Sequence, residues 1–186
     1  HDRLGAECAV KVLLGRGHES EAAVLRFQRE AAAVAKLGKH PHIVTVFDMG
    51  QEGELSYYAM ELVSGRTLRQ RIRETPPLTP LEGAVLVEKA ARALHFAHQA
   101  GIIHRDVKPG NIQIREDGEP QVMDFGLARD VGSDDHLSVS GQILGTPMYM
   151  SPEQAEGHVG LTDARTDVYG LGAVLYEILS GIPPYQ

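Results

Sequence analysis

The stretch His104-Arg105-Asp106-Val107-Lys108-Pro109-Gly110-Asn111 decides how this sequence is interpreted, because one polar loop holds a carboxylate, a lysine and an amide. A second acidic turn, Asp124-Phe125-Gly126, follows further along the chain. Between the two motifs, residues 112–114 and 121–123 have the pattern of short strands, and Glu116-Asp117-Gly118 has the composition of a turn. Either motif alone is a common polar turn. The two together, joined by a predicted hairpin, indicate one site built from both.

Composition excludes several classes of function. The chain has 186 residues, of which 42% are hydrophobic and 23% charged, which is enough for one or two packed cores. The net charge of −7 argues against nucleic-acid binding and against contact of this segment with a membrane surface, since both partners favour basic faces. The single Cys8 excludes an internal disulfide framework and favours a cytoplasmic protein.

Outward from the loop, hydrophobic periodicity and turn residues predict the other elements. Thr79 and Glu82 form a capping-box pattern at the start of a long helix that ends before Gly101. The stretch 124–153 has no clear periodicity, and loops of that length in compact domains are typically either functional or disordered. The remaining predictions are strands at 8–14, 43–49 and 55–63, and helices at 19–37, 67–73 and 165–180.

These motifs resemble those of bacterial eukaryotic-like (Hanks-type) serine/threonine protein kinases, and the resemblance spans the whole chain. It implies an α+β fold of two lobes, with a partial small lobe at residues 1–62 and a partial large lobe at residues 63–186. The strands of the glycine-rich loop and the last helices of the family are not recognised, so we expect a kinase-like domain truncated at both ends. ATP and Mg²⁺ are the cofactors that the resemblance implies.

By resemblance, Asp106 orients the substrate hydroxyl and Lys108 reaches the γ-phosphate. Asn111 and Asp124 would hold Mg²⁺, which prefers oxygen ligands. In the strand segment Ala9-Val10-Lys11, the lysine would grip the α- and β-phosphates of ATP. The resemblance also gives His104, Arg105, Phe125 and Gly126 structural roles around these groups.

Glu30 stands where the family places the partner of Lys11. The residues support this pairing independently, because Glu30 lies within the apolar helix stripe formed by Phe27, Ala31 and Val34. A carboxylate that faces a core needs a cationic partner, and Lys11 is likewise the one charge in an apolar strand. The alternative is that both are ordinary solvent-facing charges.

The end of the strand predicted at 55–63, Met60-Glu61-Leu62-Val63, resembles the hinge between the two lobes. Met60 would border the back of the nucleotide pocket, and the backbone of Glu61 and Val63 would read adenine. Gln113 occupies the strand position beneath adenine, where the family usually places an apolar residue. This departure bears on nucleotide affinity.

The segment 145–153 resembles the family's peptide-binding platform, with Ser151 where alanine is usual. Thr146 would bridge Asp106 and Lys108, and its presence favours serine or threonine substrates over tyrosine. Glu153 would pair with a residue that follows the chain. Asp167 matches the helix residue that anchors the catalytic loop, and it also suits a helix N-terminus.

Arg105 precedes the catalytic aspartate, which in this family marks kinases activated by loop phosphorylation. Ser138 and Ser140 are the preferred phosphate acceptors, modified by a second copy of the kinase. A phosphate there would pair with Arg105 and order the loop. The alternative is that both serines are solvated loop residues.

The sequence thus predicts a protein kinase that transfers the γ-phosphate of ATP to Ser or Thr of protein substrates. Two alternatives are a pseudokinase that serves as a scaffold and a small-molecule phosphotransferase of related fold. The platform at 145–153 argues against the second. The histidine pair His95 and His98 lacks a Cys or carboxylate set at zinc spacing, so we expect no zinc site there and place both histidines on the long helix.

Overall fold

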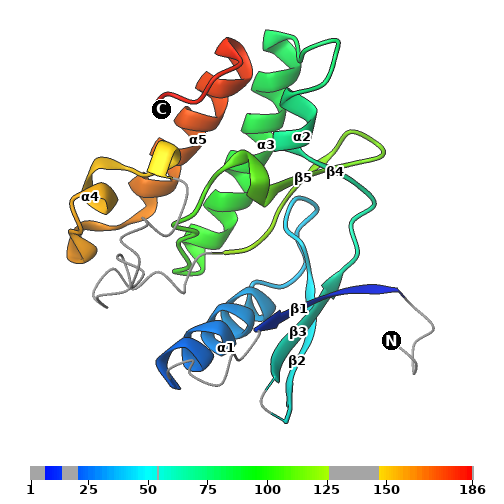
Figure 1. The fold of residues 1–186 in the computed structure, drawn as a ribbon, viewed down its shortest axis with the longest axis vertical. Helices are drawn as coiled ribbons and strands as arrows, with labels where there is room; N and C mark the ends of the chain where they lie inside the picture. Colours follow the sequence, from blue (N-terminus) through cyan, green and yellow to red (C-terminus); the bar gives the residue numbers. More distant parts are fainter. Residues whose placement is uncertain (1–6, 14–20, 54, 126–146, 186) are drawn as a thin grey trace.

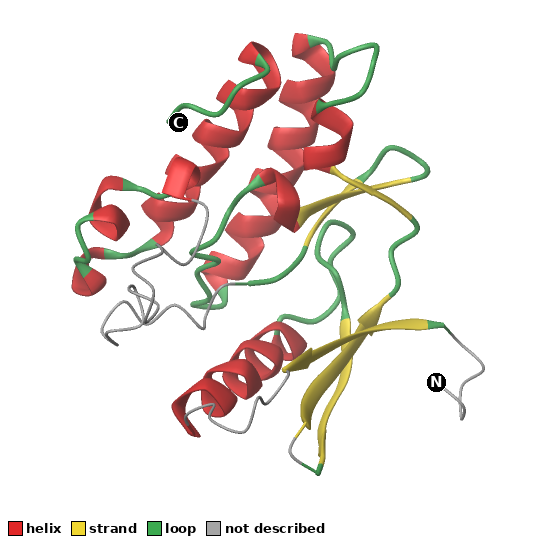
Figure 2. Cartoon of the chain, in the orientation of Figure 1, coloured by secondary structure: helices red, strands yellow, loops and turns green. Residues whose placement is uncertain are grey.

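A computed structural model of the chain describes residues 7–13, 21–53, 55–125 and 147–185 (Figure 1). Three strands and one helix form one part of the molecule, and most of the helices form the other (Figure 2). The described strands are β1 (Cys8–Leu13), β2 (Val46–Glu52), β3 (Leu55–Glu61), β4 (Gly65–Thr67), β5 (Ile112–Arg115) and β6 (Pro120–Val122). The helices are α1 (Glu21–Lys36), α2 (Leu68–Ile72), α3 (Pro80–Gln99), α4 (Pro152–Ala155) and α5 (Ala164–Ser180), with 3-10 turns η1 (Pro109–Asn111), η3 (Pro147–Tyr149) and η4 (Val159–Leu161).

The first sheet has the antiparallel order β1-β3-β2, and helix α1 lies beside it (Figure 1). Phe27 and Ala31 are four positions apart on α1 and therefore share one face of the helix. That face packs on Tyr58 of β3, and the three residues form the core of this part. In the same sheet Lys11 is paired directly with Tyr58.

The second part is built on the packing of α3 against α5. Helix α3 begins with the predicted capping box, in which the amide of Thr79 donates to Glu82 at 2.7 Å and the amide of Glu82 donates to the Thr79 hydroxyl at 3.3 Å. The helices approach closely at Gly83, where an added Cβ would lie 2.5 Å from Ile178 Cγ2. Among the described residues, no helix has the length and apolar composition needed to cross a membrane.

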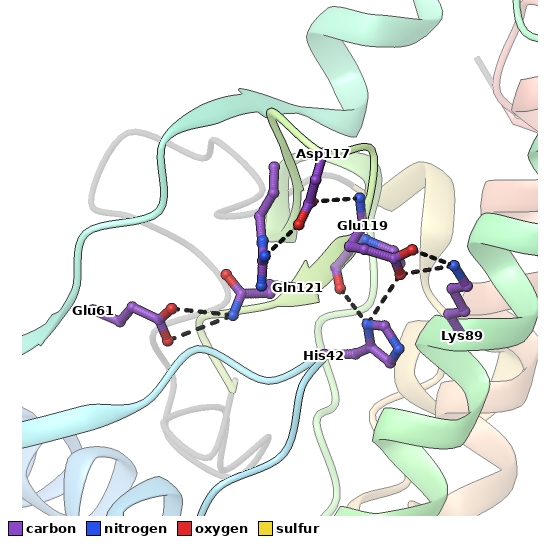
Figure 3. A network of polar contacts seen from close by, with 8 residues as sticks. His42, Glu61, Lys89, Asp117, Glu119 and Gln121 are labelled. Atoms are coloured by element: carbon purple, nitrogen blue, oxygen red, sulfur yellow. Dashed lines mark hydrogen bonds and ion pairs between the residues drawn. The ribbon is translucent and has the colours of Figure 1, made fainter.

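The loop after α1 joins the two parts. Val44 donates to the carbonyl of Val122 at 3.0 Å, and Val122 donates to the carbonyl of His42 at 2.8 Å. Figure 3 shows the His42 ring beside the carboxylate of Glu119, with Nδ1 3.9 Å from Glu119 Oε2. The same nitrogen lies 2.9 Å from the carbonyl of Pro120. Glu119 in turn accepts from Lys89 of α3 at 2.6 Å. The small sheet is therefore attached to the β5–β6 hairpin, which leads directly to Asp124.

Most predicted elements are present with boundaries moved by a few residues, and two differences have clear causes. The strand predicted at 43–49 begins at Val46 instead, because residues 42–44 bond to β6 rather than to the first sheet. Helix α4 is not among the predicted elements, and its first two residues are the last two of the stretch 124–153. It contains only four residues, too few to show a helical period.

Candidate active site

The catalytic loop brings Asp106, Lys108 and Asn111 together. Lys108 Nζ lies 2.7 Å from Asp106 Oδ2. The amide nitrogen of Asn111 donates to the carbonyl of Asp106 at 2.8 Å and to its Oδ2 at 3.0 Å. Because this nitrogen faces Asp106, the amide oxygen of Asn111 points away from it and is the atom suited to hold a cation.

Asp167, in the first turn of α5, holds the backbone of this loop from below. Its carboxylate is only 1% exposed and accepts hydrogen bonds from the amides of His104 and Arg105, both at 2.8 Å. A third contact comes from His98 Nε2, at 2.6 Å from Oδ2. Buried carboxylates are costly unless they are well bonded, and these contacts meet that requirement.

His98 is a residue whose role the sequence analysis missed. The sequence analysis places it on the long helix without a further role, whereas its ring reaches the buried carboxylate of Asp167 on α5. One feature indicates that His98 could make such a contact: it directly follows Ala97, which is buried in the packed face of α3. The partner could not be inferred, because α3 and α5 are far apart in the sequence.

Arg105 has a φ of 64°, which is a left-handed conformation that side chains rarely adopt. Two contacts hold it there: its amide bonds to Asp167, and its carbonyl accepts from the Gln154 side chain at 2.8 Å. The carbonyl oxygen of Gln154 in turn accepts from the Ser151 amide at 3.2 Å and hydroxyl at 3.3 Å. Gln154 is a second supporting residue that the sequence motif did not identify.

His104 is completely buried and connects the two motifs. Its Nδ1 accepts from the amide of Asp106 at 3.2 Å, so its Nε2 is the nitrogen that donates to the carbonyl of Met123, at 3.0 Å. The ring also lies 4.6 Å from that of Phe125. Burial lowers the pKa of His104 below its ordinary value, an effect that the nearby charge of Asp167 opposes. A neutral imidazole suits these contacts.

The β5–β6 hairpin brings Asn111 close to Asp124. Ile112 pairs with Val122, and the amide of Met123 donates to the carbonyl of Asn111 at 3.0 Å. Asp124 follows directly with a φ of 57°, which acidic residues tolerate better than most. A carboxylate and an amide oxygen are the donors that Mg²⁺ prefers, so these residues fit that ion.

Lys11 meets Asp124 across the two parts of the molecule, with Nζ 2.8 Å from Oδ1. Its side chain is 37% exposed, so this charge is only partly buried although its strand is apolar. The reason is that Lys11 lies on β1, an edge strand of the described sheet, and its ammonium group meets Asp124. Glu30 lies in α1 as predicted, but its side chain is outside the described part of the structure.

The predicted hinge follows β3. Ala9 pairs with Met60 in the sheet, and the amide of Glu61 donates to the carbonyl of Thr45 at 2.8 Å. The Glu61 amide is therefore used within the fold. Val63 follows in an irregular segment, and Gln113 is half-buried in β5.

The platform segment is partly described. Glu153 accepts from the Thr166 hydroxyl at 2.6 Å, and this bond lowers the pKa of its carboxyl. Gly126, Ser138, Ser140 and Thr146 lie outside the described residues, so their predicted roles stay predictions.

Comparison with known proteins gives a consistent result. The family model described as Protein kinase domain matches residues 1–186. The chain is 46% identical over 187 residues to the serine/threonine-protein kinase PknB of Mycobacterium leprae, an alignment that covers 98% of this chain and 30% of that protein. It is 43% identical over 185 residues to the probable serine/threonine-protein kinase CPE1738 of Clostridium perfringens, covering 99% of this chain and 26% of that protein. The chain thus spans about 30% or less of the length of these curated relatives.

Proposed function

Because the chain belongs to the protein kinase domain family, we propose that the protein transfers the γ-phosphate of ATP to serine or threonine of protein substrates. The observation that carries this proposal is the cluster of Asp106, Lys108 and Asn111 within hydrogen-bond distance of one another, on a loop whose backbone Asp167 holds. The names of the relatives, which are serine/threonine kinases, support the same activity and substrate class.

The proposed reaction is an in-line displacement. The substrate hydroxyl oxygen bonds to the γ-phosphorus, the bond from that phosphorus to the oxygen it shares with the β-phosphate breaks, and ADP leaves. Asp106 orients the hydroxyl and takes up its proton. Lys108, only 2.7 Å from Asp106, is placed to neutralise charge that develops on the phosphoryl oxygens.

Asn111 and Asp124 would hold Mg²⁺, which, when bound, neutralises the charge of the phosphates. Lys11 would contribute its ammonium to the α- and β-phosphates. Its contact with Asp124 at 2.8 Å supports this assignment, because the lysine already lies beside the metal-binding carboxylate. Met60, the carbonyl of Glu61 and Val63 would border the adenine, with Gln113 beneath it.

A transfer assay on the full-length protein tests this function. The protein is incubated with γ-labelled ATP, Mg²⁺ and a general protein substrate, and acid hydrolysis then identifies the labelled amino acid. We expect phosphoserine or phosphothreonine, and loss of at least about a hundredfold in rate for Asp106→Asn. Nucleotide binding without any transfer would indicate a pseudokinase. Label on a small molecule but on no protein would indicate the related phosphotransferases.

Regulation by phosphorylation is a finer part of the proposal. We assign the phosphates to Ser138 and Ser140, added by a second copy of the kinase, with Arg105 as the cationic partner. Mass spectrometry after incubation with ATP, together with the double variant Ser138→Ala/Ser140→Ala, tests this. If neither serine is modified and the double variant keeps full activity, the switch does not exist.

We also propose that the domain functions in the cytoplasm, where ATP and Mg²⁺ are available. The free thiol of Cys8 supports this location, since single cysteines are common in reducing compartments. Localisation of the fluorescently tagged full-length protein, combined with protease protection of this segment, tests it.

A further inference from the structure

Tyr58 connects the core of the small sheet to the proposed metal-binding carboxylate. It lies on β3 directly opposite Lys11 and is only 3% exposed. Its hydroxyl lies 3.3 Å from Asp124 Oδ1, the oxygen that also accepts from Lys11 at 2.8 Å. The Lys11 ammonium stands 5.6 Å from the centre of the tyrosine ring. One side chain thus touches both charged groups.

This contact has a physical reason. A buried hydroxyl costs free energy unless it is hydrogen-bonded, and Asp124 is within its reach. On the carboxylate of Asp124, the Tyr58 hydroxyl and the Lys11 ammonium both approach Oδ1. No donor among the described residues bonds Oδ2. Two donors that approach Oδ1 from different residues restrict the rotation of the carboxylate, and Oδ2 is then the oxygen that faces a cation.

Tyr58 also contacts helix α1. Its ring lies 5.1 Å from that of Phe27, and both residues share the small core with Ala31. The cavity left between α1, the sheet and Asp124 holds only about 10 Å³, about the space of one water molecule. A shift of α1 would therefore move the ring, and the ring would move its hydroxyl relative to Asp124.

The geometry points to Tyr58 as a positioning residue for magnesium: with Lys11 it orients Asp124, and through Phe27 it makes that orientation depend on the position of α1. This inference rests on the proposed function, since it concerns how the kinase site binds Mg²⁺. The competing explanation is that Tyr58 only fills the core. The two differ in one respect, because a core residue needs its ring but not its hydroxyl.

The variant Tyr58→Phe in the full-length protein separates the two explanations. Calorimetry measures binding of a non-hydrolysable ATP analogue across a magnesium titration, and melting measures stability. Groups that bond a metal-binding carboxylate typically contribute about 10- to 100-fold to metal affinity. The contact of the Tyr58 hydroxyl with Asp124 is long, at 3.3 Å, so its contribution should be smaller. We therefore expect the half-saturating magnesium concentration of Tyr58→Phe to be about five- to tenfold higher than that of the wild type. Analogue binding without magnesium should be unchanged, and transfer should recover largely at high magnesium.

Tyr57→Phe is the matched control. It removes the same atom from the neighbouring residue, whose side chain points to the opposite face of the strand. We expect a magnesium titration like that of the wild type. If Tyr58→Phe also titrates like the wild type, the inference is overturned while the proposed function stands. If the wild type shows no magnesium-dependent binding of the analogue, the proposed function fails and the inference fails with it.

A double-mutant cycle tests the link to α1. Phe27→Leu keeps an apolar side chain but removes the ring contact with Tyr58. We expect it to raise the half-saturating magnesium concentration in the wild-type background by about two- to threefold, and to have no further effect once the Tyr58 hydroxyl is absent. Equal effects in both backgrounds would show that α1 does not act through Tyr58.

Discussion

The two halves of the proposed site are held in different ways. In the half built on the catalytic loop, Asp167 of α5 is 1% exposed, accepts from two backbone amides of the loop and contacts His98. On the sheet side, Lys11 and Asp124 meet through side chains that are 37% and 27% exposed. Buried polar networks contribute to stability and fix geometry, whereas exposed ion pairs contribute little to stability. Substitutions in the first half should therefore affect folding and activity together, and those in the second half activity alone.

The largest expected effect on turnover is at the exposed half. Lys11→Met and Asp124→Asn each remove charge placed at the proposed phosphate and metal site, so we expect phosphate transfer by the full-length protein to fall at least about a hundredfold. The melting temperature should change by no more than about 3 °C, because a half-exposed pair contributes at most about 1 kcal/mol.

Rates and melting curves of both variants, measured on the same preparations, check this prediction. Lys36→Met, at the last turn of α1, removes a lysine that has no place in the proposed site and should leave transfer unchanged. Near-normal rates in both site variants would contradict the mechanism. Extensive unfolding would contradict the comparison of the two halves.

The buried half should respond differently to the loss of one charge. In Asp167→Asn, one carboxylate oxygen becomes an amide nitrogen that faces hydrogen-bond donors. Breaking a buried charged network typically costs 3–5 kcal/mol, so we expect the free energy of unfolding to fall by about 3 kcal/mol and transfer to fall about tenfold or more. Denaturant unfolding measures the first effect, and the transfer assay measures the second.

Asp163→Asn is the control for Asp167→Asn. Asp163 caps the same helix, α5, but bonds the exposed Arg165 at the surface. Its loss should change transfer little. If the two variants behave alike, burial of Asp167 is not what holds the loop.

The difference between the halves also explains what could be predicted from the sequence. The strands and helices follow local signals, such as the Thr79–Glu82 capping box, and the α+β class of a protein kinase domain is confirmed. The site residues are close together in the sequence within each motif, so their clustering in one loop could be expected. Asp106, Lys108 and Asn111 lie together as the spacing indicated.

The supporting contacts could not be predicted, because they join residues that are distant in the sequence. His98 reaches Asp167 only because α3 packs on α5, and Gln154 reaches the Arg105 carbonyl only because α4 lies under the loop. The sequence analysis gives Tyr58 no role beyond its place in the strand predicted at 55–63. Its contact with Asp124 depends on how the two parts of the molecule meet, which no local pattern encodes.

A smaller effect is expected at the edge of the buried half. Gln154→Met keeps the length of the side chain but removes the hydrogen bond to the Arg105 carbonyl, one of the contacts that hold its left-handed backbone. A single hydrogen bond is worth about 1 kcal/mol, so we expect about a fivefold loss of transfer. Ser151→Ala, which leaves that bond in place, should lower transfer less than twofold. Equal losses in the two variants would assign the effect to the capping contacts of α4 instead.

The smallest effect is a pH dependence of stability that arises in the buried half. Burial lowers the pKa of His104 in the folded protein, below the value of about 6.5 typical of an unfolded chain. As the pH falls, the unfolded chain therefore binds the proton first. The contribution of neutral His104 is complete above about pH 6.5 and is lost as the pH drops through the folded pKa. Melting temperatures of the wild type should accordingly decrease from pH 7 to pH 5.

Two glutamine variants identify the source of this slope. His104→Gln cannot titrate, so its melting temperature, although lower throughout, should depend less on pH over the same range. The pKa of His40 is also lowered, by partial burial and by the neighbouring His42, so His40→Gln measures how much of the slope comes from that pair. The pKa of Glu153 is lowered as well, by its bond with the Thr166 hydroxyl, so this carboxyl contributes mainly below the pH range measured. The opposite result is a melting temperature of His104→Gln that depends on pH as steeply as that of the wild type. That result would show that the proton is taken up by another group, and that acid does not act first on the buried half of the site.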